Sequence, residues 1–190
     1  SDEVLVSKLF AEAGYHCGLA GKLHLASCSD GKVEDRTDDG YEDFHWSHHP
    51  QPDWPENAYT QWLAEKGKTW DEVSGGEISP FVLEGPPAEY HQTTWCAEKT
   101  IEFIRANSER PWFFSFNCFD PHHPFDPPPE YLARYDIEEM PLPKVSPDEQ
   151  ARQTSFQQLD REWAHNSLGE FHSGAMSDSD HRQVYAAYMA

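Results

Sequence analysis

The sequence predicts an α/β fold with a mixed, mostly parallel sheet flanked by helices. Two observations carry this prediction: a helical pattern followed by a short apolar strand occurs twice, and a polar loop follows each strand. The second strand is almost continuously apolar, which is typical of a parallel strand buried on both faces. We therefore expect both polar loops at the carboxyl edge of one sheet, where ligands bind in open α/β folds.

The first helix–strand unit lies at the start of the chain. Gly14 stands where a helix C-terminus favours glycine, and residues 15–20 predict a short buried strand that ends at Gly21. The loop beyond the strand contains Lys22 and His24. The helix itself is predicted by apolar residues that share one face, namely Val6, Leu9, Phe10 and Ala13.

The second unit begins at Thr93 or Thr94, both of which are suitable helix N-caps, and its helix is expected to reach Asn107. Residues 112–119 follow as the apolar strand, and residues 120–126 form the second polar loop. The stripe of this helix comprises Ala97, Thr100, Ile101 and Ile104.

We expect residues 1–190 to be an internal portion of a single domain of a longer protein, because the chain opens and stops inside helical patterns. Residues 27–92 are expected to form a loop-rich insertion or lid, with an irregular stretch over 27–60. Residues 127–180 are expected to form an irregular connector that contains many prolines. Short helices are expected at residues 59–66, 130–135 and 180–190.

The composition indicates a folded, acidic chain. Its 190 residues include 34 acidic and 14 basic residues, for a formal net charge of -20. This charge repels nucleic acid, heparin-like polymers and anionic lipid, so we expect no nucleic-acid partner. No apolar run approaches the roughly 20 residues that cross a bilayer, so we expect no membrane span. Seven Trp, eight Tyr and 11 Phe are too many for a typical disordered acidic tail.

Lys22 and His24 are the first candidate site residues. Only one residue separates them, so in an extended loop they would present a cation and a titratable imidazole to the same side. Such a pair suits a bound oxyanion and a proton transfer. The spacing alone favours the alternative, which is a solvated lysine beside a structural histidine.

His122 and His123 are the second candidates, in a loop whose prolines stiffen the backbone. Rigid loops at a sheet edge hold reactive side chains well. The alternative is a turn that requires the geometry of Asp120-Pro121 and leaves both histidines exposed.

A third group is a histidine- and acid-rich stretch that contains possible metal ligands. The spacing of these residues matches no tetrahedral zinc pattern, so a solvated loop is the preferred interpretation. The group comprises His45, His48 and His49, with Asp43 and Asp53 nearby. The acidic run from Glu34 to Asp43 lacks the ligand spacing of a calcium loop and predicts a solvated surface. The four scattered cysteines indicate neither a disulfide scaffold nor a nucleophile.

Aromatic residues are frequent between positions 41 and 62. They would be able to stack on a sugar or aryl group, but packing in the core or under a lid is the more common role of such residues. They are Tyr41, Phe44, Trp46, Trp54, Tyr59 and Trp62.

Two stretches resemble the sulfatase family of the alkaline-phosphatase-like superfamily. Residues 9–25 are similar to its second signature, an amphipathic helix followed by Gly-Tyr-x-Thr-Gly-x-x-Gly-Lys-Trp-His-Leu-Gly. Residues 110–126 resemble the family's strand and Pro-His-x-Pro-Phe loop, and residues 182–188 resemble a later helix. The departures from the first signature are Cys17 for Thr, Leu23 for Trp and Ala26 for the last Gly.

The resemblance implies the central part of an alkaline-phosphatase-like sandwich and the hydrolysis of sulfate monoesters. Family members use a formylglycine, made from Cys or Ser, whose hydrate attacks sulfur above a divalent cation, usually calcium. By position, Lys22 would contact the sulfate and the nucleophile's hydroxyl, and His24 would hold or deprotonate that hydroxyl. His122 would donate a proton to the departing alkoxide, and His123 is a weaker candidate for substrate contact.

The signature of the nucleophile, Cys or Ser followed by x-Pro-x-Arg, occurs nowhere in the sequence. The family's paired aspartates and its later metal-binding strand are also missing. The resemblance therefore implies that the formylglycine and every ligand of the cation lie outside this chain. We expect the chain alone to be inactive.

Three functions remain open at this stage. The first is an arylsulfatase-like hydrolase of a small sulfate ester, a substrate class that the negative charge favours over polysulfated glycans. The second is a phosphonate monoester or phosphodiester hydrolase of the same superfamily. The third is a non-catalytic acidic binding module or pseudoenzyme remnant. The family resemblance favours a periplasmic or secreted location.

Overall fold

The computed structural model describes residues 3–26, 28, 33–48, 56–144, 146–159 and 176–190. The chain divides into two compact units. The first comprises Ser1–Ser74 and Ala88–Asp120, and the second comprises Gly75–Pro87 and Pro121–Ala190.

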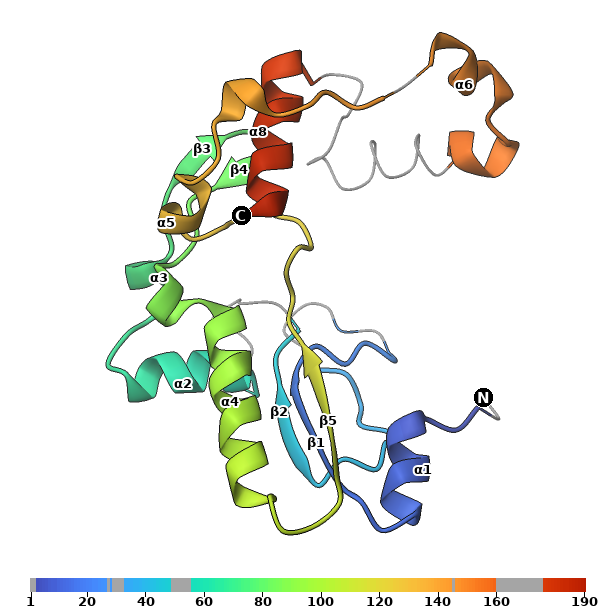
Figure 1. Cartoon of the computed structure of the whole chain (residues 1–190), viewed down its shortest axis with the longest axis vertical. Helices are drawn as coiled ribbons and strands as arrows, with labels where there is room; N and C mark the ends of the chain where they lie inside the picture. Colours follow the sequence, from blue (N-terminus) through green and yellow to red (C-terminus); the bar gives the residue numbers. More distant parts are fainter. Residues whose placement is uncertain (1–2, 27, 29–32, 49–55, 145, 160–175) are drawn as a thin grey trace. The chain divides into compact units, whose positions relative to one another are not determined.

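A three-stranded parallel sheet forms the centre of the first unit (Figure 1). β1 (His16–Gly21) lies between β2 (Asp43–Trp46) and β5 (Trp112–Asn117), and it pairs in parallel with both. The side chains of β1 are buried from Cys17 onward. The α/β class and the parallel pairing of the two predicted strands are therefore confirmed.

Two helices cover opposite faces of this sheet (Figure 1). Phe10 of α1 (Val6–Glu12) stacks on Phe113 with ring centroids 4.7 Å apart. Phe103 of α4 (Gln92–Ala106) packs against Phe114, also at 4.7 Å. Because neighbouring side chains of a strand point to opposite faces, the two contacts place α1 and α4 on different sides of β5.

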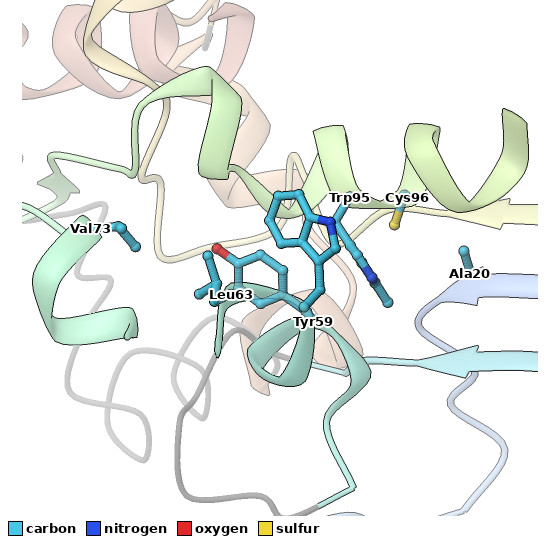
Figure 2. Packing of buried hydrophobic residues seen from close by; sticks show 7 residues of the cluster. Ala20, Tyr59, Leu63, Val73, Trp95 and Cys96 are labelled. Carbon is cyan, nitrogen blue, oxygen red and sulfur yellow. The ribbon is translucent and has the colours of Figure 1, made fainter. Parts of the chain in front are cut away.

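The main core cluster joins α4 and β1 to two shorter helices, α2 (Ala58–Glu65) and α3 (Trp70–Val73), as Figure 2 shows. The side chain of Asn57 caps α2 by accepting from the backbone N–H of Tyr59 at 3.1 Å. The short helix predicted here is therefore present. The buried members of the cluster are Ala20, Tyr59, Trp62, Leu63, Val73, Trp95 and Cys96.

The buried face of α1 differs from the predicted stripe. Val6 and Leu9 are 57% and 54% exposed, whereas Ser7 is buried. The hydroxyl of Ser7 donates to the backbone carbonyl of Asp39 at 2.6 Å, and the backbone at Gly40 lies against Lys8. A backbone segment thus covers this face and needs a small polar residue beneath it, which hydrophobic periodicity does not reveal.

Two further differences concern strands. β2 lies inside the stretch that was expected to be irregular. The sequence did not predict this strand because four residues are too few to show a period. β5 was expected to be buried on both faces, but Trp112 and Phe116 are 38% and 43% exposed. Within the described residues β5 pairs only with β1 and so forms an edge of the sheet.

The acidic run is not uniformly solvated, which corrects the sequence-based expectation. Glu34 and Asp39 are buried, with 7% and 1% exposure. Asp39 accepts two hydrogen bonds from the guanidinium of Arg36, at 2.9 and 2.6 Å, and one from the backbone N–H of Tyr41 at 2.9 Å. These carboxylates organise the loop between β1 and β2.

The second unit contains a small antiparallel pair, β3 (Glu77–Ser79) and β4 (Val82–Leu83), and the helix α8 (Asp178–Met189). Ser177 and Asp180 form a capping box at the start of α8, whose presence confirms the predicted last helix. The guanidinium of Arg182 donates to the carbonyls of Glu138 and Met140. Further short helices of this unit include α5 (Pro129–Leu132), η2 (Ile137–Glu139) and α6 (Pro147–Arg152).

Among the described residues, none of the helices has the length and apolar character that a membrane span requires.

Candidate active site

The strands of the first unit bring three loops to one edge of the sheet. In the parallel register, Gly21 at the end of β1 is opposite Trp46 at the end of β2 and Asn117 at the end of β5. The segments that begin at Lys22, Ser47 and Cys118 therefore leave the sheet together. This is the carboxyl edge, where open α/β sheets bind ligands.

Asn117 fixes the backbone of Lys22 at both of its polar groups. The N–H of Lys22 donates to the backbone carbonyl of Asn117 at 2.8 Å, and the side-chain amide of Asn117 donates to the carbonyl of Lys22 at 3.0 Å. The turn depends on Gly21, whose φ of 110° is in the region that favours glycine. A Cβ at Gly21 would collide with the Asn117 carbonyl.

The ammonium of Lys22 is partly sheltered and lies 5.5 Å from the centroid of the Phe119 ring. Burial lowers the pKa of Lys22, and the Coulomb interactions with the Cys28 and Glu34 side chains act in the opposite direction. None of the ion pairs among the described residues includes Lys22. The side chain is thus a cation that a small anion is able to bind.

His24 follows in the same loop and is exposed. Its ring meets that of His48 edge-on, with centroids 4.6 Å apart. One ring nitrogen from each histidine and the sulfur of Cys28 all lie within 4.8 Å of one another. Because Cys28 is also an electrostatic neighbour of Lys22, the side chains of Lys22 and His24 both approach this thiol.

Glu34 holds this loop against the sheet. Its carboxylate accepts hydrogen bonds from the backbone N–H groups of Leu25 and Ala26, at 3.0 and 3.2 Å. It also accepts from the indole N–H of Trp46 at 3.2 Å, and the same indole is 3.2 Å from the carbonyl of Leu23. Sequence reasoning missed Glu34 because nothing distinguishes it from the other acids of its run.

His122 and His123 belong to the second unit, in the turn that follows β5. Their rings stack with centroids 4.3 Å apart, and Nδ1 of His122 is 2.5 Å from the carbonyl of His123. With Nδ1 as the donor in that hydrogen bond, Nε2 of the exposed His122 is the atom that would exchange a proton with a ligand. The convergence of His122 with Lys22 and His24 stays a prediction.

The histidine-rich stretch does not act as one cluster in the part of the chain that is described. His45 is half-buried on β2, whereas His48 lies beyond the strand end beside His24 and Cys28. His49 and Asp53 lie outside the described residues. The candidate metal ligands His24, Cys28 and His48 therefore come from two connections, the one that follows β1 and the one that follows β2.

Packing accounts for most of the aromatic residues between positions 41 and 62. Tyr41, Trp46, Tyr59 and Trp62 are all buried, with exposures of 9% or less, so core packing rather than ligand stacking is confirmed for these four. Trp54 lies outside the described residues.

A model of the sulfatase family matches residues 1–189, which is nearly the whole chain. The chain belongs to the sulfatase family. Its relatives include an arylsulfatase of Clostridium perfringens (strain 13 / Type A), to which it is 28% identical over 155 residues. It is also 28% identical over 142 residues to the multifunctional alkaline phosphatase superfamily protein PehA of Trinickia caryophylli. These matches cover 74% and 70% of this sulfatase-family chain but 31% and 26% of the relatives.

Solved structures support the alkaline-phosphatase-like fold of this sulfatase-family member. The phosphonate monoester hydrolase SpPMH from Silicibacter pomeroyi is similar over 99% of this chain, with a TM-score of 0.67 and 16% identity. The phosphonate monoester hydrolase of Agrobacterium radiobacter is similar over 97%, with a TM-score of 0.62 and 20% identity. The chain spans 40% of each of these two structures.

The residues present in this sulfatase-family chain do not fit the formylglycine or the calcium ion that the family implies. No Cys or Ser is followed by x-Pro-x-Arg in the sequence. Among the described residues, the clustered groups suited to a metal are two imidazoles and a thiol, whereas calcium prefers oxygen ligands.

Proposed function

We propose that the chain is the central portion of the catalytic domain of a sulfuric ester hydrolase that acts on a small sulfate monoester. The observation that carries this proposal is the position of Lys22 and His24, on a loop fixed by Asn117 at the carboxyl edge of the sheet. In this proposal residues 27–92 are a loop-rich insertion or lid of that domain, and residues 127–180 are a connector that ends in the first turn of α8. A periplasmic or secreted location belongs to the same proposal.

Lys22 would contact a sulfate oxygen and stabilise the negative charge that develops as the ester bond breaks. The attraction between unit charges about 4 Å apart is worth roughly 1 kcal/mol in water and roughly 4 kcal/mol at an effective dielectric constant near 20. Partial burial of Lys22 moves the interaction toward the larger value. The same burial weakens the competition of water for the ammonium.

The two histidines would transfer protons at opposite ends of the reaction. His24, beside Lys22, would hold or deprotonate the hydroxyl of the attacking group. His122 would donate a proton from Nε2 to the departing alkoxide. Without this proton the alkoxide is a strong base and therefore a poor leaving group. His123 is a second candidate for contact with the sulfate ester.

The attacking group and the divalent cation would come from parts of the protein outside this chain. We therefore expect no metal-dependent sulfatase activity from the chain alone. Measurable turnover of an aryl sulfate by the isolated 190 residues would contradict this division of the site.

The proposal is tested in the complete enzyme with Lys22→Ala and His122→Ala, with Lys66→Ala as the control, because Lys66 is exposed and pairs with Glu98. Loss of Lys22 should lower kcat/KM by about 10²–10³-fold. Loss of His122 should cost about 10²–10⁴-fold with an alkyl sulfate and much less with p-nitrophenyl sulfate, whose leaving group needs no proton. Unchanged rates in both variants would remove the two residues from the mechanism.

Hydrolysis of a phosphonate monoester or phosphodiester is the second candidate, and the similarity to two phosphonate monoester hydrolases favours it. A sulfate monoester carries one negative charge, as an aryl methylphosphonate monoester does. The single positive charge of Lys22 would therefore attract either substrate. Comparison of kcat/KM for p-nitrophenyl sulfate and p-nitrophenyl phenylphosphonate by the complete enzyme separates the two. Turnover of neither would favour a non-catalytic member of the family.

A further inference from the structure

We propose that His24, Cys28 and His48 form a binding site for Zn²⁺ that is separate from the family's calcium site. Each residue offers one ligand atom, and the three atoms lie within 4.8 Å of one another. In an occupied tetrahedral zinc site, with Zn–N near 2.1 Å and Zn–S near 2.3 Å, ligand atoms are about 3.3–3.8 Å apart. Each pair would have to close by at most about 1–1.5 Å to reach these separations, which side-chain rotation is able to supply.

The sheet holds the two histidines close together before any metal binds. His24 follows the end of β1 and His48 follows the end of β2, and these strands are parallel neighbours with Gly21 opposite Trp46. The backbone N–H of Ser47 donates to the carbonyl of Gly21 at 3.0 Å. The hydroxyl of Ser47 is also bound by the buried Gln92 amide at 2.6 Å, so the residue before His48 is anchored twice.

Glu34 supplies the second support. Its carboxylate binds the backbone of Leu25 and Ala26, directly after His24, and the indole of Trp46, which precedes His48 by two positions. It is also an electrostatic neighbour of Cys28. One buried negative charge therefore steadies the loops of both histidines and compensates part of the positive charge that a metal ion brings.

The ligand set selects the metal. Two imidazoles and a thiolate are nitrogen and sulfur ligands that suit Zn²⁺, whereas Ca²⁺ and Mg²⁺ require oxygen ligands. As the sulfur–zinc bond forms, Cys28 releases its thiol proton to solvent, and each histidine donates the lone pair of one ring nitrogen. Three protein ligands leave a fourth position for water.

Occupancy of this site has a functional consequence that rests on the proposed function. A ring nitrogen of His24 that is bound to zinc has no lone pair left to accept a proton. Zinc is therefore expected to inhibit ester hydrolysis, and a chelator that binds zinc selectively over calcium is expected to reverse the inhibition.

Binding is measured first and needs no activity. The reduced, purified protein is titrated with Zn²⁺ alone and, as a spectroscopic probe, with Co²⁺ alone. We expect one equivalent at this site and the near-ultraviolet sulfur-to-cobalt absorption of a thiolate ligand. Cys28→Ser and His48→Gln should weaken zinc binding at least about tenfold, and Cys28→Ser should abolish the cobalt band. The matched controls Cys118→Ser and His45→Gln should keep both signals.

An unchanged zinc affinity in Cys28→Ser and His48→Gln would overturn the site, as would a cobalt band that Cys118→Ser removes and Cys28→Ser does not. In the complete enzyme, each variant is then compared with its own zinc-free rate, and we expect Cys28→Ser to lose the inhibition. Zinc that binds through Cys28 without slowing turnover would overturn the proposed link between zinc binding and proton transfer by His24. It would leave zinc binding by Cys28 in place. An enzyme that hydrolyses no sulfate ester would overturn the proposed function, while the titrations alone decide the zinc site.

Discussion

The buried carboxylate of Glu34 accepts a hydrogen bond from the indole N–H of Trp46 at 3.2 Å, across the space between β2 and the loop that follows β1. The same carboxylate binds the backbone at Leu25 and Ala26. One side chain therefore links the Lys22–His24 loop to the sheet.

Replacement of Glu34 by Ala should lower the free energy of unfolding by about 1–3 kcal/mol, because buried donors lose their acceptor. In the complete enzyme it should also lower kcat/KM, since the loop that holds Lys22 loses a support. Denaturant titration and steady-state kinetics check the two effects. Glu109→Ala, at an exposed position, is the control and should change neither. A Glu34→Ala protein of unchanged stability would contradict this role.

Gly21 should tolerate no larger residue. Gly21→Ala would place a methyl group onto the Asn117 carbonyl and also force φ of 110°, so we expect a loss of about 3 kcal/mol or more, or a failure to fold. Gly14→Ala is a matched control, because φ there is 88° but nothing lies within 4 Å of the new Cβ. It should cost only about 1–2 kcal/mol. Equal losses in thermal unfolding experiments would exclude the steric contact as the cause.

His45 should make the protein less stable in mild acid. Burial lowers the pKa of its imidazole, the nearby Lys99 ammonium lowers it further, and the carboxylates of Asp43 and Glu102 act in the opposite direction. Below about pH 6.5 the unfolded chain binds a proton that the folded protein resists, so stability falls as the pH decreases.

The contribution of His45 to the change of the unfolding free energy with pH cannot exceed about 1.4 kcal/mol per pH unit. Unfolding titrations between about pH 8 and pH 5 should show a smaller loss in His45→Gln than in the wild type. Parallel stability curves for the two proteins would refute the assignment.

Cys96 should resist alkylation in the folded protein. Burial, together with the nearby Cys118 and Asp120 side chains, raises the pKa of its thiol to about 12. At about pH 8 its thiolate fraction is then roughly a thousandfold below that of an ordinary cysteine. Mass spectrometry after iodoacetamide treatment should find Cys96 modified only after unfolding in urea. Modification of Cys96 in the folded protein at the rate seen in urea would contradict its burial.

Local sequence patterns were sufficient for the helices and strands that carry a strong period or a clear stop. α4, β1 and β5 occur within a few residues of their predicted ranges, because stripes, apolar runs and glycines are local signals. β2 was missed because four residues carry no period and its register depends on β1. The buried face of α1 was misplaced because Ser7 packs beneath a backbone segment more than 30 positions away.

In the candidate site too, residues with local sequence signals were predicted, and residues placed by contacts between distant segments were not. Lys22 and His24 were found because they share a short loop and a family motif. Glu34 was not found, because its burial depends on partners contributed by β2 and by the loop after β1. The proximity of His24, Cys28 and His48 was also hidden, since no spacing along the chain records that the ends of β1 and β2 are neighbours.

Asn117 binds both backbone polar groups of Lys22 although the two residues are 95 positions apart in the chain. The location of the cation is thus set by strand pairing and not by the length or composition of the connectors in between. During divergence, insertions and substitutions in those connectors are able to reshape what surrounds the ligand while Lys22 keeps its place. New specificities are therefore open to this scaffold without rebuilding the part that we propose binds the anion.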